Sequence, residues 1–241
     1  KSSPWNSPLL AVKKRDGATR SVTNYSAKKK NGKSINELIS FPRWPLPNLS
    51  KMFKDISEQI ARIKKNGHEP VITTLDISNA FFGLRLRPQS RPITAFTSRA
   101  MERQYCYTSM PQGISSAPSV FSEFMCKILK GLDTDDSRVY SYLDDIFIVS
   151  RIENNVKLVE ITLKRLMDEQ TIVKLEKCKF LTKEVEFLGF RISTEGVNLP
   201  QRRLKTLLEM RIPRTKVQAH AYAGAWCYFS PTIPRVQALL S

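Results

Sequence analysis

Hydrophobic positions recur every three or four residues in three stretches of the chain, and each stretch predicts an amphipathic helix. The first follows an extended, proline-rich segment (42–47), begins after Asn48, a helix-capping residue type, and ends at Asn66-Gly67. Its apolar positions are Leu49, Met52, Phe53, Ile56, Ile60 and Ile63. The second stretch has Val120, Phe121, Phe124, Met125, Ile128, Leu129 and Leu132 at these positions, and the third has Val156, Val159, Leu163, Leu166 and Met167.

Shorter apolar runs bounded by turn residues predict strands. Residues 9–12 and 20–25 alternate around Asp16-Gly17, which predicts a hairpin that carries basic residues. A strand over 71–75 ends at Asp76, and two strands over 139–142 and 146–149 flank a tight turn at Leu143-Asp144-Asp145. Strands over 185–193 and 197–199 meet at Glu195-Gly196, and helices follow Pro200 and Thr215. This mixed order predicts an α+β fold in which helices back a sheet.

Composition and charge narrow the function classes. The 241 residues suffice for one large domain or two small ones, and 41% hydrophobic with 25% charged residues excludes a disordered chain or a coiled-coil rod. No apolar run is long enough to cross a membrane. The net charge is +17, and its basic residues are interleaved with folded segments rather than gathered in a tail. Nucleic acid is therefore favoured over an anionic membrane as the partner.

Cysteine and histidine chemistry is not indicated. Cys106, Cys126, Cys178 and Cys227 lie far apart, and with the isolated His68 and His220 they give no zinc-ligand spacing. We expect reduced, mostly packed thiols in an intracellular protein. The first residues lack an initiator Met and a signal-like apolar segment, so we also expect a piece of a longer polypeptide.

Two acidic features occupy positions where an unpaired charge is costly. Asp76 ends a strongly apolar strand, and Asp144-Asp145 occupies the turn of an apolar hairpin. Desolvating a carboxylate is unfavourable unless it is paired or bound to a metal, and these three could hold two Mg²⁺ ions about 4 Å apart. Other acids, at Asp133, Asp135 and Asp136, lack apolar flanks and follow a helix end, so we interpret them as plain loop.

Several motifs in this order resemble those of reverse transcriptases. They are LDISNAFF at 75–82, MPQGISSAPSVF at 110–121 and YLDD at 142–145. The later motifs KLEKCKF at 174–180 and EFLGF at 186–190 are most similar to gypsy-type LTR retrotransposons, with retroviral enzymes close behind. With SPLLAVKKRDG at 7–17 and WPLP at 44–47, the resemblance covers nearly the whole chain.

The resemblance implies the right-hand polymerase fold, an α+β fold with a palm sheet backed by helices. Residues 1–75 would be mainly fingers, 76–90 palm with the first catalytic motif, 91–110 fingers, and 111–194 palm with a primer-grip-like hairpin. Residues 195–241 would begin a truncated thumb, and the RNase H domain would be absent.

The resemblance also implies a metal site and a general acid. The metal ligands would be Asp76, Asp144, Asp145 and the backbone of Ile77, with two Mg²⁺ ions, or Mn²⁺ as a substitute. Lys177 would protonate the departing pyrophosphate. If the alignment is shifted, Lys174 or Lys179 would take that role.

Further residues would bind nucleotide and primer by the same resemblance. Lys14 and Arg20 would hold the triphosphate, which suits a flexible ammonium and a bidentate guanidinium. Phe81 would close the pocket under the sugar and favour deoxynucleotides, and Gln112 and Gly113 would line the nucleotide and template pocket. The hairpin Phe187, Leu188, Gly189 and Phe190 would position the primer end. Without the motifs, Lys14 and Arg20 would be interpreted as solvated charges of the N-terminal hairpin. Core packing is an equally good interpretation of Phe81 and of the apolar residues at 187–190.

The sequence departs from the family pattern at three places. Thr23-Asn24-Tyr25-Ser26 stands where the family usually has Val-Asp-Tyr-Arg, and Ile93 replaces a frequent Lys before Thr-Ala-Phe. Residues 28–33 look like an inserted loop. No expected metal ligand is lost, so we predict a competent active site.

The function implied is that of an RNA-directed DNA polymerase core of a retroelement polyprotein, which adds deoxynucleotides to a primer 3′ end by two-metal-ion nucleotidyl transfer. Its partners would be an RNA or DNA template with primer, deoxynucleoside triphosphates, and the RNase H and integrase domains of the parent polyprotein, with no membrane. The expected location is the cytoplasm, in a virus-like particle, or the nucleus. One alternative is a degenerate or domesticated domain that binds nucleic acid without catalysis. A viral RNA-dependent RNA polymerase is a second alternative. It is disfavoured because such enzymes usually have Gly-Asp-Asp and a polar residue under the sugar, where this chain has Tyr142-Leu143 before the acids and Phe81.

Overall fold

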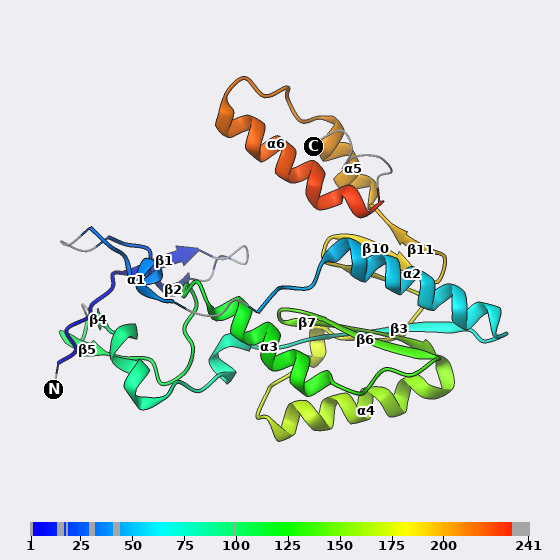
Figure 1. Ribbon diagram of the computed structural model, residues 1–241, viewed down its shortest axis with the longest axis horizontal. Helices are drawn as coiled ribbons and strands as arrows, with labels where there is room; N and C mark the ends of the chain where they lie inside the picture. The colour runs from blue at the N-terminus through cyan, green and yellow to red at the C-terminus, as the bar shows by residue number, and fades with distance from the viewer. Residues whose placement is uncertain are drawn as a thin grey trace.

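The chain folds into a larger part, a smaller part and a pair of helices (Figure 1). The computed structural model describes residues 2–13, 17, 19–28, 32–40, 44–98 and 100–232. A four-stranded sheet with long helices and a three-stranded sheet lie at the right of Figure 1, two-stranded sheets lie at the left, and helices α5 and α6 stand above. No helix among the described residues is long and apolar enough to cross a membrane.

The four-stranded sheet is the centre of the fold. Its strands are β6 (Ser137–Tyr142), β7 (Asp145–Arg151), β3 (Pro70–Asp76) and β8 (Lys179–Thr182), in that order, and every neighbouring pair is antiparallel. Strand β3 is buried along its length except at Asp76, because both faces of the sheet are covered. Residues 71–75, including Thr73 and Thr74, are therefore buried because they form a central strand of this sheet.

Different elements cover the two faces of this sheet. One face packs against α2 (Leu49–Lys65) and the small sheet β11-β10-β9, through a cluster that includes Phe53, Phe147 and Phe190. The other face packs against α3 (Ala117–Leu129) and α4 (Ile152–Asp168), through Phe121 and Ile146 among others. Helix α2 begins at the predicted cap, where the Asn48 side chain accepts a hydrogen bond from the Lys51 N–H.

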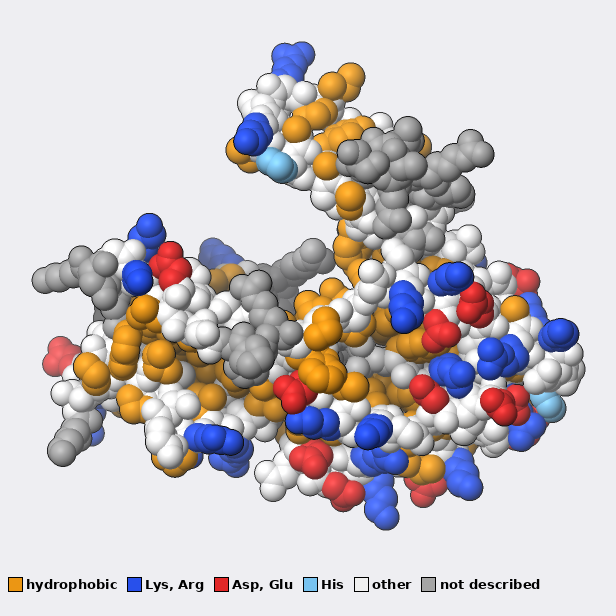
Figure 2. Space-filling model, viewed as in Figure 1, with side chains coloured by type: hydrophobic (Ala, Val, Ile, Leu, Met, Phe, Trp, Pro, Cys, Tyr) orange, Lys and Arg blue, Asp and Glu red, His pale blue; other side chains and the backbone are white. Residues whose placement is uncertain are grey.

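The chain after the sheet forms a hairpin and two helices. Strands β9 (Glu184–Phe187) and β10 (Phe190–Ser193) replace the single predicted strand over 185–193, because Leu188 and Gly189 take positive φ values and reverse the chain. Strand β11 (Gly196–Asn198) follows. Helices α5 (Gln201–Leu208) and α6 (Lys216–Phe229) and the turn η4 (Ser230–Thr232) then stand apart from the left-hand part, with open space between them (Figure 2).

The smaller part contains short elements around a separate cluster that includes Tyr25, Ile35 and Met110. Strands β1 (Leu9–Lys13) and β2 (Thr19–Thr23) form the predicted hairpin, and α1 (Ile35–Leu38) packs beside it. Strands β4 (Phe96–Ser98) and β5 (Arg103–Tyr105) form a second two-stranded sheet. The turns η1 (Ala80–Gly83), η2 (Pro88–Thr94) and η3 (Leu175–Lys177) complete the elements.

Some sequence predictions are wrong in detail. Helix α3 ends at Leu129, and the buried Leu132 lies beyond it, after Gly131 with a positive φ. On α4, Val156 and Met167 are exposed although they continue the apolar repeat. The thiols are also less packed than expected, because three of the four cysteines are exposed and only Cys178 is partly buried.

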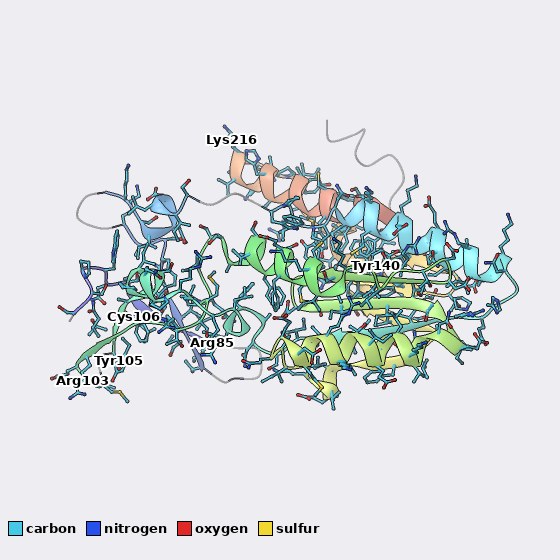
Figure 3. The ribbon with its side chains drawn as sticks, turned by 60° about the horizontal axis from the view of Figure 1, so that its bottom comes forward. Arg85, Arg103, Tyr105, Cys106, Tyr140 and Lys216 are labelled. Atoms are coloured by element: carbon cyan, nitrogen blue, oxygen red, sulfur yellow. The ribbon has the colours of Figure 1, made fainter. Side chains whose placement is uncertain are left out.

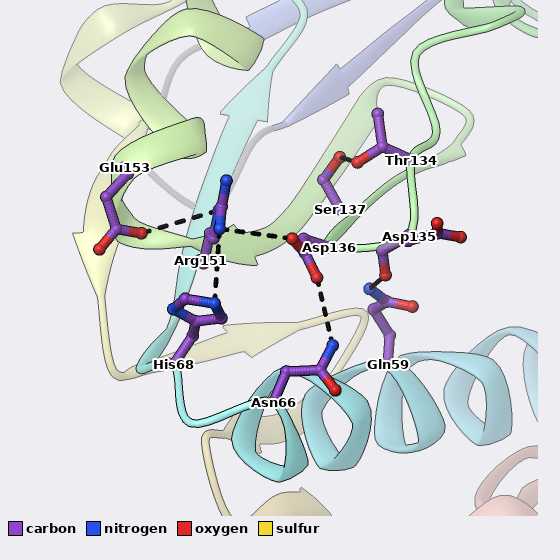
Figure 4. A network of polar contacts seen from close by, with 9 residues as sticks. All are labelled: Gln59, Asn66, His68, Thr134, Asp135, Asp136, Ser137, Arg151 and Glu153. Carbon is purple, nitrogen blue, oxygen red and sulfur yellow. Dashed lines mark hydrogen bonds and ion pairs between the residues drawn. The ribbon is translucent and has the colours of Figure 1, made fainter.

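The acidic loop 133–136 is part of a polar network rather than a plain loop (Figure 4). An Asp136 carboxylate oxygen lies 3.6 Å from the Arg151 guanidinium, and the Asp135 carbonyl accepts a hydrogen bond from the Gln59 side chain. Arg151 also contacts His68. These contacts join α2 to the ends of β6 and β7, so the loop has a structural role that its composition did not reveal.

Candidate active site

The three predicted catalytic carboxylates lie at one end of the four-stranded sheet. In the β3–β7 ladder Asp76 is directly opposite Asp145. In the β6–β7 hairpin Tyr142 pairs with Asp145 next to the turn. Asp145 is therefore the first residue of β7, and the turn itself consists of Leu143 and Asp144. The Ile77 N–H donates a 2.8 Å hydrogen bond to the Asp144 carbonyl, which joins the turn to the end of β3.

The backbone of this turn is strained, and hydrogen bonds hold it in place. Leu143 has φ 54°, a left-handed value that costs a non-glycine residue roughly 1–3 kcal/mol. Asn79, which follows β3, has φ 50°. Two hydrogen bonds tie the end of β3 to the segment 172–174: the Ser78 N–H donates to the Ile172 carbonyl, and the Lys174 N–H donates to the Asp76 carbonyl. The carboxylates thus project from rigid, over-determined backbone.

Two cavities flank the carboxylates, and Asp76 lines both. The first, of about 440 Å³, is also lined by Asp144, Ile77, Phe81 and Gln112. The second, of about 340 Å³, is also lined by Asp145 and by the hairpin residues Phe187, Leu188 and Gly189. The structure therefore brings together most of the predicted site residues, in two groups that meet at Asp76.

Lys177 joins the two groups. Its ammonium lies 3.2 Å from an Asp76 carboxylate oxygen, and its side chain lines both cavities while remaining half exposed. Lys174 lines only the first cavity and Lys179 only the second. Of the three lysines considered from the sequence, Lys177 has the position from which it could reach a group bound at either side of Asp76.

Negative charge is concentrated here. Burial, followed by the neighbouring charges of Asp144 and Asp76, raises the pKa of the Asp145 carboxyl to about 6, and Lys177 partly offsets this. No three acidic, histidine or cysteine side chains among the described residues converge closely enough to hold an ion together. The donor chemistry nevertheless suits a hard divalent cation, since these are carboxylate oxygens whose mutual repulsion a cation would relieve.

Phe81 forms part of the wall of the first cavity. Its ring meets the fully buried Phe121 ring edge-on, with centroids 5.7 Å apart, while part of its surface stays accessible. Phe81 therefore packs against the core and also lines the first cavity, and its role under the sugar stays a prediction.

Gly113 lines neither cavity and instead packs against the backbone of β2. Its φ is +96°, and a Cβ atom there would lie 2.9 Å from the Thr23 carbonyl oxygen of β2. Its own carbonyl accepts a 3.0 Å hydrogen bond from the Asn36 side chain, which also accepts from the Ser115 N–H. Asn36 thus clamps the segment that places Gln112, a role with no signal in the sequence.

The hairpin at 187–190 combines core and surface. Phe187 and Phe190 are buried and pack against Phe147 and Phe53, at centroid distances of 5.0 and 4.5 Å. The turn residues Leu188 and Gly189 reach the second cavity, and the Leu188 carbonyl accepts a hydrogen bond from the Tyr228 hydroxyl of α6. The tip and the β9 edge of this hairpin therefore face the second cavity, while most of the Phe187 and Phe190 surface is packed in the core.

Lys14 lies outside the described residues. Of Arg20 only the backbone is described, and it pairs with Val12 in the β1–β2 hairpin.

The sequence did not predict several cavity residues that come from distant segments. Ser21, Val22, Thr23 and Tyr107 line the first cavity, and Glu186 lines the second.

Known proteins resemble the chain over most of its length. The family model "Reverse transcriptase (RNA-dependent DNA polymerase)" matches residues 12–192. The retrovirus-related Pol polyprotein from transposon 297 of Drosophila melanogaster is 28% identical over 97% of this chain, and the transposon Tf2-3 polyprotein of Schizosaccharomyces pombe is 29% identical over 96%. The chain spans 21% and 16% of the lengths of these two relatives.

Solved structures show the same fold. A foamy viral protease-reverse transcriptase in complex with double-stranded DNA superposes with a TM-score of 0.72 and 27% identity, over 95% of this chain and 36% of that one. The same kind of protein in complex with an RNA/DNA hybrid gives a TM-score of 0.71 at 24% identity, over 100% of this chain and 30% of that one. The α+β polymerase fold that the motifs predicted is therefore confirmed. The chain belongs to the reverse transcriptase family, and its relatives are the Pol polyproteins of retroelements.

Proposed function

We propose that the chain is the catalytic core of an RNA-directed DNA polymerase, which adds deoxynucleotides to the 3′ end of a primer. The observation that carries this proposal is the meeting of two cavities at Asp76, one with Asp144 and Phe81, the other with Asp145 and the Leu188–Gly189 tip. A polymerase needs two adjacent sites of this kind, one for the incoming nucleotide and one for the primer end.

Asp76, Asp144 and Asp145 would hold Mg²⁺, with the backbone at Ile77 beside them. Bound there, the metal would lower the pKa of the primer hydroxyl and stabilise negative charge on the phosphates. The β3–β7 register presents Asp76 and Asp145 side by side, and the strained turn presents Asp144 from the next position. The raised pKa of Asp145 is what a carboxylate awaiting a cation would show.

Lys177 is proposed as the proton donor. Its ammonium is held by Asp76 at 3.2 Å, yet its side chain is 55% exposed and can turn toward a pyrophosphate oxygen. The proton on Nζ would pass to that oxygen as the bond between the α-phosphorus and its bridging oxygen breaks. On the opposite side of the α-phosphorus the primer 3′ oxygen would form the new bond to that phosphorus, and its proton would pass to solvent water.

Phe81 is proposed to select the sugar. Because Phe121 supports its ring, Phe81 cannot retract easily to admit a 2′-hydroxyl. The Leu188–Gly189 tip is proposed to support the primer end, and Lys14 and Arg20 to contact the triphosphate. An RNA or DNA template–primer duplex is the proposed partner, because the solved relatives are described in complex with double-stranded DNA and an RNA/DNA hybrid.

The regional assignment remains part of this proposal. Fingers would comprise mainly residues 1–75 and 91–110, palm 76–90 and 111–194, and the start of the thumb 195–241. Helix α2 and strand β3 fall almost entirely within the first range, yet β3 is a central strand of the sheet that carries the carboxylates and α2 packs on that sheet.

Primer extension on an RNA template with deoxynucleotides and Mg²⁺ tests the proposal. We expect Asp144→Asn to abolish extension while duplex binding persists, and the charge-matched Asp168→Asn, at the exposed end of α4, to extend like the wild type. A wild-type chain that binds the duplex tightly but never extends it would support the binding-only alternative. Extension that survives Asp144→Asn would refute the assigned site.

A further inference from the structure

Strand β8 bulges opposite Thr73 of β3. The two ladder pairs on either side of Thr73 are separated by this single residue on β3, but by Phe180 and Leu181 on β8. Leu181 has φ 52°, a left-handed value that is strained for a residue with a side chain. A bulge of this kind re-aims the side chains beside it, which is why bulges recur next to active sites.

The bulge lies just after the turn η3, whose last residue is Lys177. This turn is attached to β3 on both sides. Before it, the Lys174 N–H donates a 2.9 Å hydrogen bond to the Asp76 carbonyl, and after it Lys179 pairs with Thr74. Without the bulge the pairing of β8 would shift by one residue, and such a shift reverses the side of the sheet on which each side chain lies. The contact of the Lys177 ammonium with Asp76, at 3.2 Å, therefore depends on the bulge.

Apolar packing does not hold the bulge in place. Phe180 is 43% exposed and Leu181 is 42% exposed. Instead, the Leu181 N–H donates a 3.2 Å hydrogen bond to the Thr73 hydroxyl, and beside it the Thr182 hydroxyl donates to the Ile72 carbonyl at 3.2 Å. The Thr73 side chain thus provides the partner for a backbone group that the bulge removes from the regular ladder.

The Thr73 hydroxyl is itself fixed from the helix side of the sheet. It donates a 2.7 Å hydrogen bond to the Asn155 side chain of α4, which donates a 2.9 Å hydrogen bond to the Ser150 hydroxyl of β7. Helix α4 runs along one face of the four-stranded sheet (Figure 1 and Figure 3), and none of these three side chains is more than 1% exposed. Because the only proton of the Thr73 hydroxyl points to Asn155, its oxygen is left to accept from β8. We call Thr73, Asn155 and Ser150 the buried clasp.

We propose that Thr73 and Asn155 are positioning residues for Lys177. The buried clasp holds the β8 bulge, and the bulge aims the Lys177 ammonium at the carboxylate site. The clasp acts indirectly, because its three side chains line neither of the two cavities. A sheet that lost the Thr73 hydroxyl would leave the Leu181 N–H without its partner, which favours a relaxed β8. The inference rests on the proposed function, in which Lys177 donates the proton.

The first test is single-turnover incorporation of a deoxynucleotide with Mg²⁺ at saturating template–primer duplex. Thr73→Val keeps the shape of the side chain and removes its hydroxyl. It should lower the incorporation rate about 10-fold to 100-fold, as expected for a misplaced general acid, with unchanged duplex affinity. Thr73→Ser keeps the hydroxyl and should incorporate like the wild type. In a Lys177→Met background Thr73→Val should have no further effect, because the group that it positions is already lost.

The second test is amide hydrogen exchange of the β8 peptide, measured by mass spectrometry, which does not depend on activity. Exchange should be faster in Thr73→Val and unchanged in Thr73→Ser. The matched control is Thr162→Val, since Thr162 is equally buried but its hydroxyl bonds to the Leu158 carbonyl within α4. This control should leave β8 exchange and incorporation unchanged. Asn155→Ala should give a smaller change than Thr73→Val in both tests, and it replaces Thr73→Val if that variant does not fold.

Wild-type exchange of β8 in Thr73→Val would overturn the inference, and so would faster exchange with a wild-type incorporation rate. A rate decrease that persists in full in the Lys177→Met background would also overturn it, because the effect would then not pass through Lys177. A wild-type chain that never incorporates a nucleotide would refute the proposed function and the role of Lys177 with it. The exchange data would still show whether Thr73 holds the bulge, so the two failures are distinguishable.

Discussion

Replacing Asp145 with Asn should stabilise the metal-free protein at neutral pH. The carboxyl has a pKa of about 6 when folded, against 3.8 for the unperturbed group, mainly because burial and then the charges of Asp144 and Asp76 oppose its ionisation. A difference of this size corresponds to about 3 kcal/mol at 1.36 kcal/mol per pKa unit. Because the side chain is only partly buried, solvent screening reduces the expected gain to about 1–2 kcal/mol.

The sign of the pH dependence follows from proton linkage. A carboxyl with a raised pKa binds its proton more tightly in the folded state, so this group destabilises the folded protein increasingly as the pH rises from about 4 to about 6. The full penalty is present at pH 7.5, where the substitution Asp145→Asn should raise the midpoint of thermal unfolding by about 2–8 °C for a chain of this size. At about pH 4.5 the gain should fall below half.

The assay is thermal denaturation followed by circular dichroism, with a chelator present, at both pH values. Asp168→Asn removes an exposed carboxylate at the end of α4 and should show no comparable pH-dependent gain. Added Mg²⁺ should stabilise the wild type and have a smaller effect on Asp145→Asn, since one proposed ligand is lost. The reasoning would be refuted if Asp145→Asn were less stable than the wild type at pH 7.5, or if its gain were equal at both pH values.

Four further predictions rest on particular contacts. Gly113→Ala should cost about 1–3 kcal/mol in urea unfolding, because φ is +96° and the new Cβ would meet the Thr23 carbonyl at 2.9 Å; unchanged stability would contradict this packing. Phe147→Ala should cost about 3–5 kcal/mol, since this fully buried ring contacts Tyr140 and Phe187; a loss under 1 kcal/mol, about the cost of an exposed site, would contradict it. Phe81→Ala should increase ribonucleotide incorporation relative to deoxynucleotide incorporation, and an unchanged ratio would remove the proposed sugar selection. Duplex affinity should fall with salt at a log–log slope of roughly −0.9 per phosphate contact, and a flat response would refute the electrostatic argument.

The sequence predicted best where local pattern and tertiary environment agree. Helix α2 begins and ends where Asn48 and Asn66-Gly67 indicate, because its cap and its apolar face act within a few turns. The β6–β7 hairpin was predictable because two apolar stretches flank a short polar turn, although Asp145, expected in the turn, is the first residue of β7. In both cases the residues that determine the structure are neighbours in the chain.

Structure that depends on distant segments was not predictable in this way. Strand β8 pairs with β3 only at Ile72–Thr182 and Thr74–Lys179, with an irregularity between them, and Leu181 has φ 52°. Strands β4 and β5 have three residues each, too few to show a period. The short β8 and β5 strands therefore depend on partners that no local pattern reveals.

In the candidate site, too, the residues with a local sequence signal were predicted and those placed by distant segments were not. Asp76 and Asp144 were identifiable because charge at the end of an apolar strand is costly without a partner. Tyr107 and Thr23 reach the first cavity only through the packing of the smaller part against the sheet end, and their own sequence contexts carry no chemical signal. The network around Asp136 and Arg151 likewise depends on three separate elements meeting.

The central claim is that Asp76, Asp144 and Asp145 form the catalytic centre of a DNA polymerase. The most direct test is single-turnover incorporation of one deoxynucleotide opposite an RNA template base, measured with Mg²⁺ for the wild type and Asp144→Asn at equal duplex occupancy. The account predicts incorporation by the wild type and its loss in the variant, with the deoxynucleotide preferred over the ribonucleotide. Equal incorporation by the two proteins, or none by a wild-type chain that fully occupies its duplex, would contradict it.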